Sequence, residues 1–387
     1  MAGATGIKTS SMGYRTVIMS LDIAHSLSDI FDLEKDLLDR NKGKLIKIRD
    51  KLWIQELDIN REIQENWGDI HKYISTLLNT TGLDEVLAEE LSILPGMEEV
   101  SLLLYINKYA KENKFDVIIL DCAPTGESLR FISIPTSLEW YIKKIFRMEK
   151  AIAKYVGPIA QRMYDVPIPD QSYFEAIESL FQRLRGVDQI MVDPEMTSVR
   201  LVTNPEKIVL KETQRAFMYF SLYQMNVDAI IMNRIIPSEI KDAYFKGWRK
   251  SQRNYMEKAK EYFSPVPIFT INLLRDEILG YEYLKELADQ IYEDMSPLER
   301  FYQGEPCSIT KENGQYQIKI KLPFIAKEDI ELNKTSDELI ISLGGFKKSI
   351  LLPRQVAASK SIKAKYEGND LFIYMGGDDH GKRENKR

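Results

Sequence analysis

Two short apolar runs that each end on an aspartate constrain the fold more than any other feature of this sequence. "RTVIMSLD" spans Arg15 to Asp22, and "FDVIILDCAPTGES" spans Phe115 to Ser128. Both runs are rich in aliphatic and β-branched residues, which is typical of strands buried on two faces. A buried strand that stops on a carboxylate presents that charge at the edge of a parallel sheet, where α/β proteins bind their ligands.

Three further apolar runs have the same character: "SVRLVT" from Ser198, "DAIIMN" from Asp228 and "PVPIFTI" from Pro265. Between the runs lie segments of helical period, such as "KETQRAFMYFSLYQM" from Lys211 to Met225. This alternation predicts an α/β fold, with a doubly wound and mostly parallel sheet. Asp22, Asp121 and Asn233 fall at predicted strand ends and are therefore candidate ligand-binding residues.

Composition narrows the class of protein. A chain of 387 residues with 44% apolar and 29% charged residues predicts two or three folded units. The formal net charge of -5 argues against a nucleic-acid-binding surface. Cys122 and Cys307 are the only cysteines, so a C-x-x-C zinc clamp cannot form within one chain and a reducing compartment is favoured. We find no secretory signal and no apolar run of 18 residues, and we expect a cytoplasmic protein without a transmembrane segment.

The pattern changes from about Cys307. "GQYQIKIKLPF" alternates Tyr316, Ile318, Ile320 and Leu322 with polar residues, and two later segments have similar short β-like patterning with glycine turns between them. A small all-β sandwich is therefore expected at the C-terminal end of the chain. We expect residues 377–387 to be a disordered tail.

Each acid-ended strand has two interpretations. A strand that runs from Asp121 into Ala-Pro-Thr-Gly can place a carboxylate near a nucleotide-bound Mg²⁺ and let backbone N–H groups approach a phosphate. The alternative is a capping aspartate at a strand-to-helix turn. "LDIAHSLSDIF", from Leu21 to Phe31, has the same two interpretations, because serine and aspartate commonly begin helices.

Taken together, these turns carry a family resemblance. "DIAHSLSDIF" resembles the D-P-A-H-S-L-S-D switch segment of the ArsA-type family, the ATPases that drive arsenical pumps and their relatives that target tail-anchored membrane proteins. "DCAPTGESLR", from Asp121 to Arg130, resembles the family's second switch. "LPGMEE", "VDPEMTSVRLVTNPEKIVLKETQR" and "IMNR" also match in the family's order, so the resemblance covers about residues 1–285.

The opening string "GATGIKTS" looks like a damaged phosphate-binding loop, but Lys8 does not fit that role. In the family the loop lysine precedes the switch aspartate by about two dozen residues, whereas Lys8 precedes Asp22 by 14. A strand over 16–21 also leaves no room for a helix that starts at Lys8. The stretch instead resembles the helix and second strand that follow the loop. The fold is therefore expected to be P-loop-NTPase-like without the first strand and the phosphate loop, either because the start was assigned to an internal methionine or because the loop has been lost.

The resemblance implies roles for particular residues, with ATP and Mg²⁺ as cofactors. Asp22 would position the attacking water or act as general base, and Asp121 would hold the water shell of Mg²⁺. The remaining nucleotide-binding positions would be Thr125 and Gly126 at the γ-phosphate, Glu206, Asn233 and Arg234 at the ribose or adenine, and Asn272, Leu273 and Leu274 in a later loop. The later loop matches only loosely, because Asn272 stands where the family favours proline.

The sequence departs from the family's pattern in its two switches and in its metal-binding cysteines. Ile23 and Glu127 replace the switch proline and histidine, and the family's zinc-binding C-x-x-C and arsenite-binding cysteine triad are absent. Neither of the family's two known client roles is therefore supported, although the resemblance implies a homodimer. The insert at 131–184 predicts client-binding or membrane-facing helices, with core packing as the alternative for its stripe of Leu138, Tyr141, Ile142 and Ile145.

The resemblance also sets the expected domain organisation. We predict an ATPase domain over 1–300 and a sandwich over 301–376 that resembles the α-crystallin-type domain of small heat-shock proteins. The sandwich would hold clients or dimerise through its edge strands, or serve only stability. The expected function is an ATP-hydrolysing nucleotide switch for a hydrophobic or membrane-protein client. The alternative is a nucleotide-independent scaffold that has lost its phosphate loop.

Overall fold

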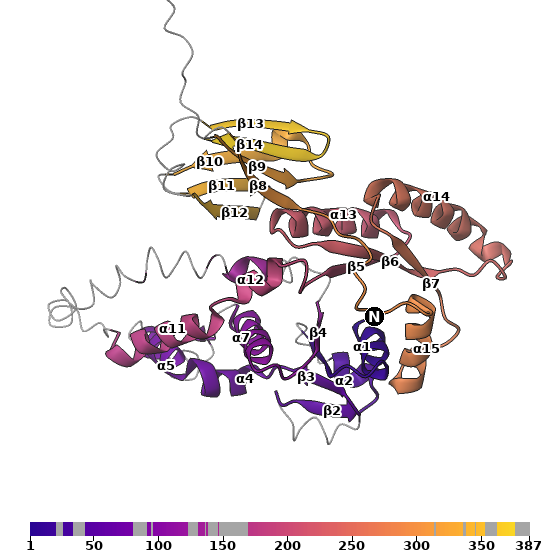
Figure 1. Cartoon of the computed structure of the whole chain (residues 1–387). Helices are drawn as coiled ribbons and strands as arrows, with labels where there is room; N and C mark the ends of the chain where they lie inside the picture. The colour runs from indigo at the N-terminus through magenta and orange to yellow at the C-terminus, as the bar shows by residue number, and fades with distance from the viewer. Residues whose placement is uncertain are drawn as a thin grey trace, which may run out of the picture. The chain divides into compact units, whose positions relative to one another are not determined.

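The computed structural model describes residues 1–20, 26–33, 43–79, 91–93, 96–122, 131–135, 137, 146, 169–312, 315–335, 338–344, 346–352 and 362–375. The chain divides into two compact units (Figure 1). The first comprises residues 1–190 with 274–299, and the second comprises 191–273 with 300–387. None of the helices in these described ranges combines the length and apolarity needed to cross a membrane.

The first unit is built on a four-stranded sheet of order β2-β3-β1-β4. Its strands are β1 (Thr16–Ser20), β2 (Ile46–Arg49), β3 (Leu52–Glu56) and β4 (Val117–Asp121). Strand β1 pairs in parallel with both β3 and β4, whereas β2 pairs antiparallel with β3. The two predicted acid-ended runs are therefore neighbouring parallel strands, and β2 and β3 are strands that the sequence did not reveal.

Helices complete the first unit. They are α1 (Ala2–Ser11), α2 (Ser26–Ile30), α4 (Ile59–Glu62), the π-helix η1 (Ile63–Trp67), α5 (Gly68–Asn79), α7 (Met97–Lys111), α11 (Gln171–Leu184) and α15 (Gly280–Tyr292). Helix α12 (Val187–Val192) spans the boundary between the units. Side chains of α1, α2 and α15 share one apolar core with β1 and β3.

Gly6 explains part of the opening string. A Cβ atom at this position would lie 2.5 Å from Ile18 Cδ1, so glycine lets α1 pack closely on β1. Helix α1 ends at Ser11 and β1 begins at Thr16, as the comparison with the helix and second strand of the family predicts. The glycines of "GATGIKTS" thus lie within a packed helix.

The second unit begins with a parallel three-stranded sheet of order β5-β6-β7. It contains β5 (Val199–Thr203), α13 (Lys207–Leu222), β6 (Val227–Ile235), the 3-10 helix η3 (Ala243–Phe245), α14 (Lys246–Phe263) and β7 (Ile268–Asn272). All three strands were predicted. Within the described residues, however, the predicted parallel strands form two sheets and not one, because β4 and β5 each end a sheet.

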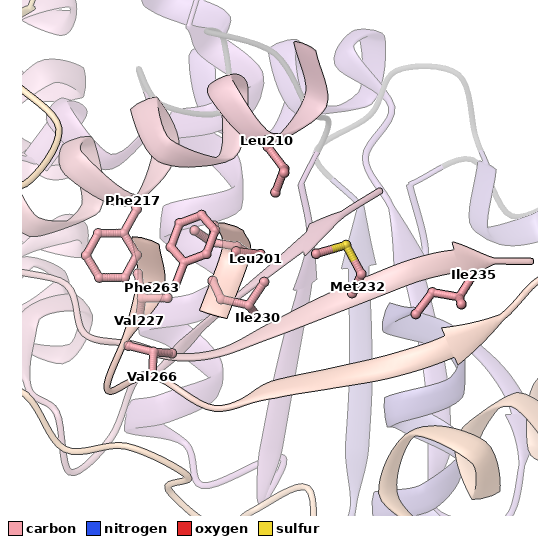
Figure 2. Close-up of a cluster of buried hydrophobic side chains, with 10 residues drawn as sticks. Leu201, Leu210, Phe217, Val227, Ile230, Met232, Ile235, Phe263 and Val266 are labelled. Atoms are coloured by element: carbon pink, nitrogen blue, oxygen red, sulfur yellow. The ribbon is translucent and has the colours of Figure 1, made fainter. Parts of the chain in front are cut away.

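Helices α13 and α14 cover one face of this sheet. Figure 2 shows Leu210 and Phe217 of α13 and Phe263 of α14 packed against Leu201 and Ile230 of the strands. Ile230 is fully buried and Phe263 is 1% exposed, as expected for the centre of an apolar core.

The rest of the second unit is the predicted antiparallel sandwich. One sheet has the order β13-β14-β9-β8 and the other β10-β11-β12. The strands are β8 (Cys307–Glu312), β9 (Gln315–Lys321), β10 (Ile330–Lys334), β11 (Glu338–Leu343), β12 (Phe346–Leu351), β13 (Ile362–Glu367) and β14 (Asp370–Met375), with the short 3-10 helix η4 (Lys327–Asp329) before β10. Ile318 and Ile320 of β9 are buried, which confirms the predicted alternation.

The sandwich packs on α13 and α14 through aromatic side chains. Phe324 follows β9, and its ring centre lies 6.2 Å from that of Phe217, 6.1 Å from Tyr262 and 5.8 Å from Phe263. Tyr219 of α13 contacts Phe346 of β12, with the two rings tilted and their centres 3.8 Å apart. The seam between sandwich and helices is thus an extension of the core in Figure 2.

The connection from α15 to the sandwich is also held in place. The side-chain amide of Asn226 donates to the Tyr302 carbonyl over 2.8 Å and accepts from the Gly304 backbone N–H over 3.2 Å. Phe301 lies 4.8 Å from Phe269 of β7, centre to centre. Residues 301–304, which lead into the sandwich, are therefore held by hydrogen bonds and ring contacts.

Two further predictions fall largely on residues that the structure does not describe. Of the helical insert, the described α11 buries Phe174, Ile177, Leu180 and Leu184 and contacts α5 and α7, which is core packing. The stripe of Leu138, Tyr141, Ile142 and Ile145 lies outside the described residues, as does the tail at 377–387.

Candidate functional site

The carboxyl ends of β1, β3 and β4 place three polar residues in one row. Ser20, the last residue of β1, is the register partner of Glu56 on β3 and of Asp121 on β4. Neighbouring strands lie about 4.8 Å apart, so the row brings a hydroxyl and two carboxylates together at one sheet edge. Ser20 is 4% exposed and Glu56 7% exposed, whereas Asp121 is half-buried.

Asp121 lies close to the start of helix α1. Burial lowers the pKa of the Met1 amino group, and the negative charge of Asp121 acts in the opposite direction. Helix α1 has no acidic residue in its first turn. Because a helix N-terminus carries a partial positive charge, the start of α1 is a favourable neighbour for the Asp121 carboxylate.

Lys8 points elsewhere. Its ammonium group donates to Asp289 Oδ1 over 3.2 Å and to the Glu293 carbonyl over 2.7 Å, both at the C-terminal end of α15. Lys8 also lies about 9 Å along the axis from the first residue of α1, given 1.5 Å of rise per residue. The lysine therefore joins two helices, in agreement with the prediction that it is not the phosphate lysine.

Glu56 is a residue of this sheet edge that sequence reasoning missed. Its Oε1 accepts hydrogen bonds from the backbone N–H groups of Leu27 over 2.9 Å and Ser28 over 3.1 Å, and its Oε2 accepts from the Ser28 hydroxyl. A buried carboxylate needs such donors to offset its desolvation. Nothing in "LWIQELD" separates this glutamate from a surface one, because its partners lie 28 and 29 residues away.

A second group of predicted residues gathers at the carboxyl ends of β6 and β7. Asn272 ends β7 and is the register partner of Ile235, and the Leu273 N–H donates to the Ile235 carbonyl over 2.7 Å. Asn233 and Arg234 immediately precede Ile235, where the register of the β6–β7 pair shifts. The second unit thus brings these four predicted residues to one edge of its sheet.

Arg234 has a left-handed backbone conformation and an exposed side chain. Its φ of 56° is left-handed, and its side chain is exposed, whereas Asn233 is half-buried. Gln252 of α14 holds the next peptide, because it accepts from the Ile236 N–H over 2.8 Å and donates to the Ile236 carbonyl over 3.4 Å. A left-handed arginine costs about 1 kcal/mol or more, and such strain persists only where surrounding contacts fix it.

The other predicted residues fall as follows. Glu206 is exposed and precedes α13 without a capping bond from its side chain. Leu274 is half-buried and belongs to the first unit. Asp22, Thr125 and Gly126 lie outside the described residues.

A metal centre made of protein side chains is not found in the part of the chain that the structure describes. No three His, Cys, Asp or Glu side chains gather there as metal ligands would. A single carboxylate such as Asp121 suits Mg²⁺, which keeps most of its water and uses few protein ligands.

Parallel strands that carry acidic and amide side chains at their carboxyl ends, flanked by helices, define an α/β fold of the P-loop NTPase type. The family model described as anion-transporting ATPase matches residues 1–293, and a model described as the HSP20-like domain found in ArsA matches 313–375. The chain belongs to the ArsA ATPase family. Both parts of the predicted resemblance are confirmed, while the boundary at residue 300 stays a prediction.

Similar proteins span most of this chain. "Putative arsenical pump-driving ATPase 1" of Aquifex aeolicus is 46% identical over 379 residues, which cover 97% of this chain and 96% of that protein. "Putative arsenical pump-driving ATPase" of Prosthecochloris vibrioformis is 33% identical over 96% of this chain and 91% of its own length. "ATPase get3" of Sclerotinia sclerotiorum is 26% identical over 74% of this chain and 83% of its own length.

Proposed function

We propose that this protein is a nucleotide switch that binds ATP with Mg²⁺ and hydrolyses it at the carboxyl ends of its parallel strands. The observation that carries the proposal is the row of Ser20, Glu56 and Asp121 beside the start of α1. Membership of an ATPase family supports the same reaction.

The proposed division of labour follows the predicted roles. Asp22 positions or deprotonates the attacking water, and Asp121 binds the water shell of Mg²⁺. Thr125 and Gly126 contact the γ-phosphate. The nucleoside is bound by a second set of residues, namely Glu206, Asn233, Arg234, Asn272, Leu273 and Leu274. The exposure of Arg234 and its neighbour Asn272 on adjacent strands supports this second assignment. The magnesium ion would neutralise charge on the phosphates during transfer.

The hydrolysis step is tested with Asp22→Asn in the full-length gene product. We expect nearly unchanged ATP affinity and turnover at least ~100-fold slower, the usual scale for loss of a positioned base. Asp116→Asn is the matched control, since Asp116 immediately precedes β4 at the opposite end from Asp121 and pairs with Arg15. Equal turnover in the Asp22 variant and wild type would remove Asp22 from the mechanism.

The competing function is a nucleotide-independent scaffold. It is favoured by one observation: the 387 residues contain no G-x-x-x-x-G-K-[ST] sequence, although backbone N–H groups of such a loop supply most phosphate affinity. Calorimetry with MgATP on the 387-residue chain should therefore show weak or no binding. Micromolar binding by these residues alone would show that another group replaces the loop.

Two finer proposals concern partners. We propose a homodimer that assembles around nucleotide, and sizing with and without an ATP analogue tests it; a monomer under both conditions contradicts a shared site.

We also propose that the insert at 131–184 binds a hydrophobic or membrane-protein client. A photo-crosslinker at Leu138 should label an apolar helical peptide, whereas one at the buried Ile177 should not. Equal labelling at both positions would contradict a client surface.

A further inference from the structure

Glu56 ties β3 to the start of helix α2 through three donors on one carboxylate. The N–H groups of Leu27 and Ser28 lie 2.9 and 3.1 Å from Oε1, and the Ser28 hydroxyl donates to Oε2. Ser28 is fully buried, and Glu56 is 7% exposed. The carboxylate therefore fixes the first turn of α2 in a place from which water is excluded.

Helix α2 depends on such contacts for its position. It has five residues, far fewer than a helix needs to be stable by itself in water. Leu27 and Phe31 hold it to the core by apolar packing, which is not directional. The bonds to Glu56 are directional and charge-assisted, so they set where the helix begins.

The segment before α2 begins at the end of β1, on the strand next to that of Glu56. Ser20, where β1 ends, is the register partner of Glu56 in the parallel β1–β3 pair. Residues 21–25 therefore join the end of β1 to a helix start that the Glu56 carboxylate holds. Asp22 belongs to these five residues.

We propose that Glu56 is a positioning residue for the first switch: its carboxylate holds the start of α2, where the segment that carries Asp22 ends. The inference rests on the proposed hydrolysis of ATP and names a residue that the family resemblance did not bring forward. A displacement of about 1 Å at a reacting group can cost ~100-fold in rate, so a buried anchor this close in the chain matters for turnover.

The matched control is a substitution of Tyr109, the hydrogen-bond partner of Gln55, which lies next to Glu56 on β3 and points to the other face of the sheet. Gln55 is 2% exposed, accepts from the Tyr109 hydroxyl over 2.7 Å, and donates to the Gly43 carbonyl over 3.2 Å. Successive side chains of a strand point to opposite faces. Tyr109→Phe therefore removes a buried hydroxyl from the neighbour of Glu56 without touching α2, as Ser28→Ala removes one from Glu56 itself.

The first experiment needs no nucleotide. Amide hydrogen exchange is followed in the 387-residue chain for wild type, Glu56→Gln, Ser28→Ala and Tyr109→Phe. We expect Glu56→Gln to speed exchange at Leu27 and Ser28 by ~10-fold or more, Ser28→Ala to do so less, and Tyr109→Phe to leave both amides unchanged. Unchanged exchange in Glu56→Gln, or equal acceleration in Tyr109→Phe, would overturn the anchoring role.

The second experiment measures steady-state hydrolysis by the full-length gene product. Glu56→Gln should lower kcat ~30-fold or more while KM for MgATP stays within ~3-fold, and Tyr109→Phe should change neither. A lower melting temperature with unchanged kcat would make Glu56 merely structural. If Glu56→Gln fails to fold, Ser28→Ala keeps the carboxylate and must still lower kcat. Absence of hydrolysis in wild type would refute the proposed function, while the exchange experiment would still decide whether Glu56 anchors α2.

Discussion

Substitution of Phe324 measures how much the contacts between the sandwich and helices α13 and α14 contribute to the free energy of unfolding. Its ring lies edge-on to three aromatic rings, at centre distances of 6.2, 6.1 and 5.8 Å. Aromatic pairs of this kind contribute about 0.5–1.5 kcal/mol each. Phe324 remains 38% exposed, so the lower half of that range applies and Phe324→Ala should cost about 2 kcal/mol.

The backbone at Phe324 provides a second variant with a different magnitude. Its φ of 69° is left-handed, which costs a residue with a Cβ about 1–2 kcal/mol and costs glycine almost nothing. Phe324→Gly loses the same ring contacts as Phe324→Ala but removes this strain. We therefore expect the glycine variant to be about 1 kcal/mol more stable than the alanine variant.

The assay is urea unfolding followed by hydrogen-exchange mass spectrometry, with peptides from β9 and α13 monitored separately. In wild type both peptides should unfold at one midpoint, whereas Phe324→Ala should lower the midpoint of at least one of them. Ile309→Ala, on an exposed side chain of β8, is the control and should change the free energy of unfolding by less than about 0.5 kcal/mol. Separate midpoints in wild type, or an alanine variant as stable as wild type, would refute the coupling.

Three smaller predictions follow from charged and phenolic groups. Arg200→Met should destabilise the second unit by about 3–5 kcal/mol, because it leaves the fully buried Asp228 without its cation; a loss below about 1 kcal/mol in thermal unfolding would contradict this. Burial raises the pKa of Tyr109 to about 12 from 10.0, so stability should be complete below pH 10 and fall as pH rises toward 12, and Tyr109→Phe should flatten that alkaline slope. Hydrogen bonds from Arg15 lower the pKa of Asp116 to about 2 from 3.8. This carboxylate should therefore stabilise the fold above pH 3.8 and lose its contribution as pH falls toward 2. An NMR titration of Asp116 in the wild-type protein with a midpoint near 3.8 would contradict the pairing with Arg15.

The fold was predictable where local pattern and packing agree. Strands β1 and β4 were found because they contain three and four successive apolar residues, respectively, before a polar end. Strand β3 was missed because Gln55 and Glu56 interrupt its apolar pattern, although both are buried. Their burial depends on partners such as Tyr109, 54 residues away, which local sequence does not reveal.

The candidate site was predictable in part for a similar reason. Strand ends predicted Asp121 and Asn233, and the structure places both near the carboxyl ends of parallel strands. Gln252 could not be found, because its role is to hydrogen-bond a backbone peptide 16 residues earlier in the chain. Contacts of this type depend on how a helix packs, which periodicity alone does not determine.

The aromatic seam between α13 and the sandwich has a consequence for how such a chain can change by mutation. Tyr219 and Tyr223 face the sandwich, where the Tyr219 ring contacts that of Phe346 and the Tyr223 hydroxyl donates to the Lys347 carbonyl over 3.3 Å. Deletion of the sandwich at the level of the gene would transfer this aromatic surface to water, where it would favour aggregation. Loss of the module is therefore tolerable only together with polar replacements on α13, so the two halves of the seam must be inherited or lost as one unit.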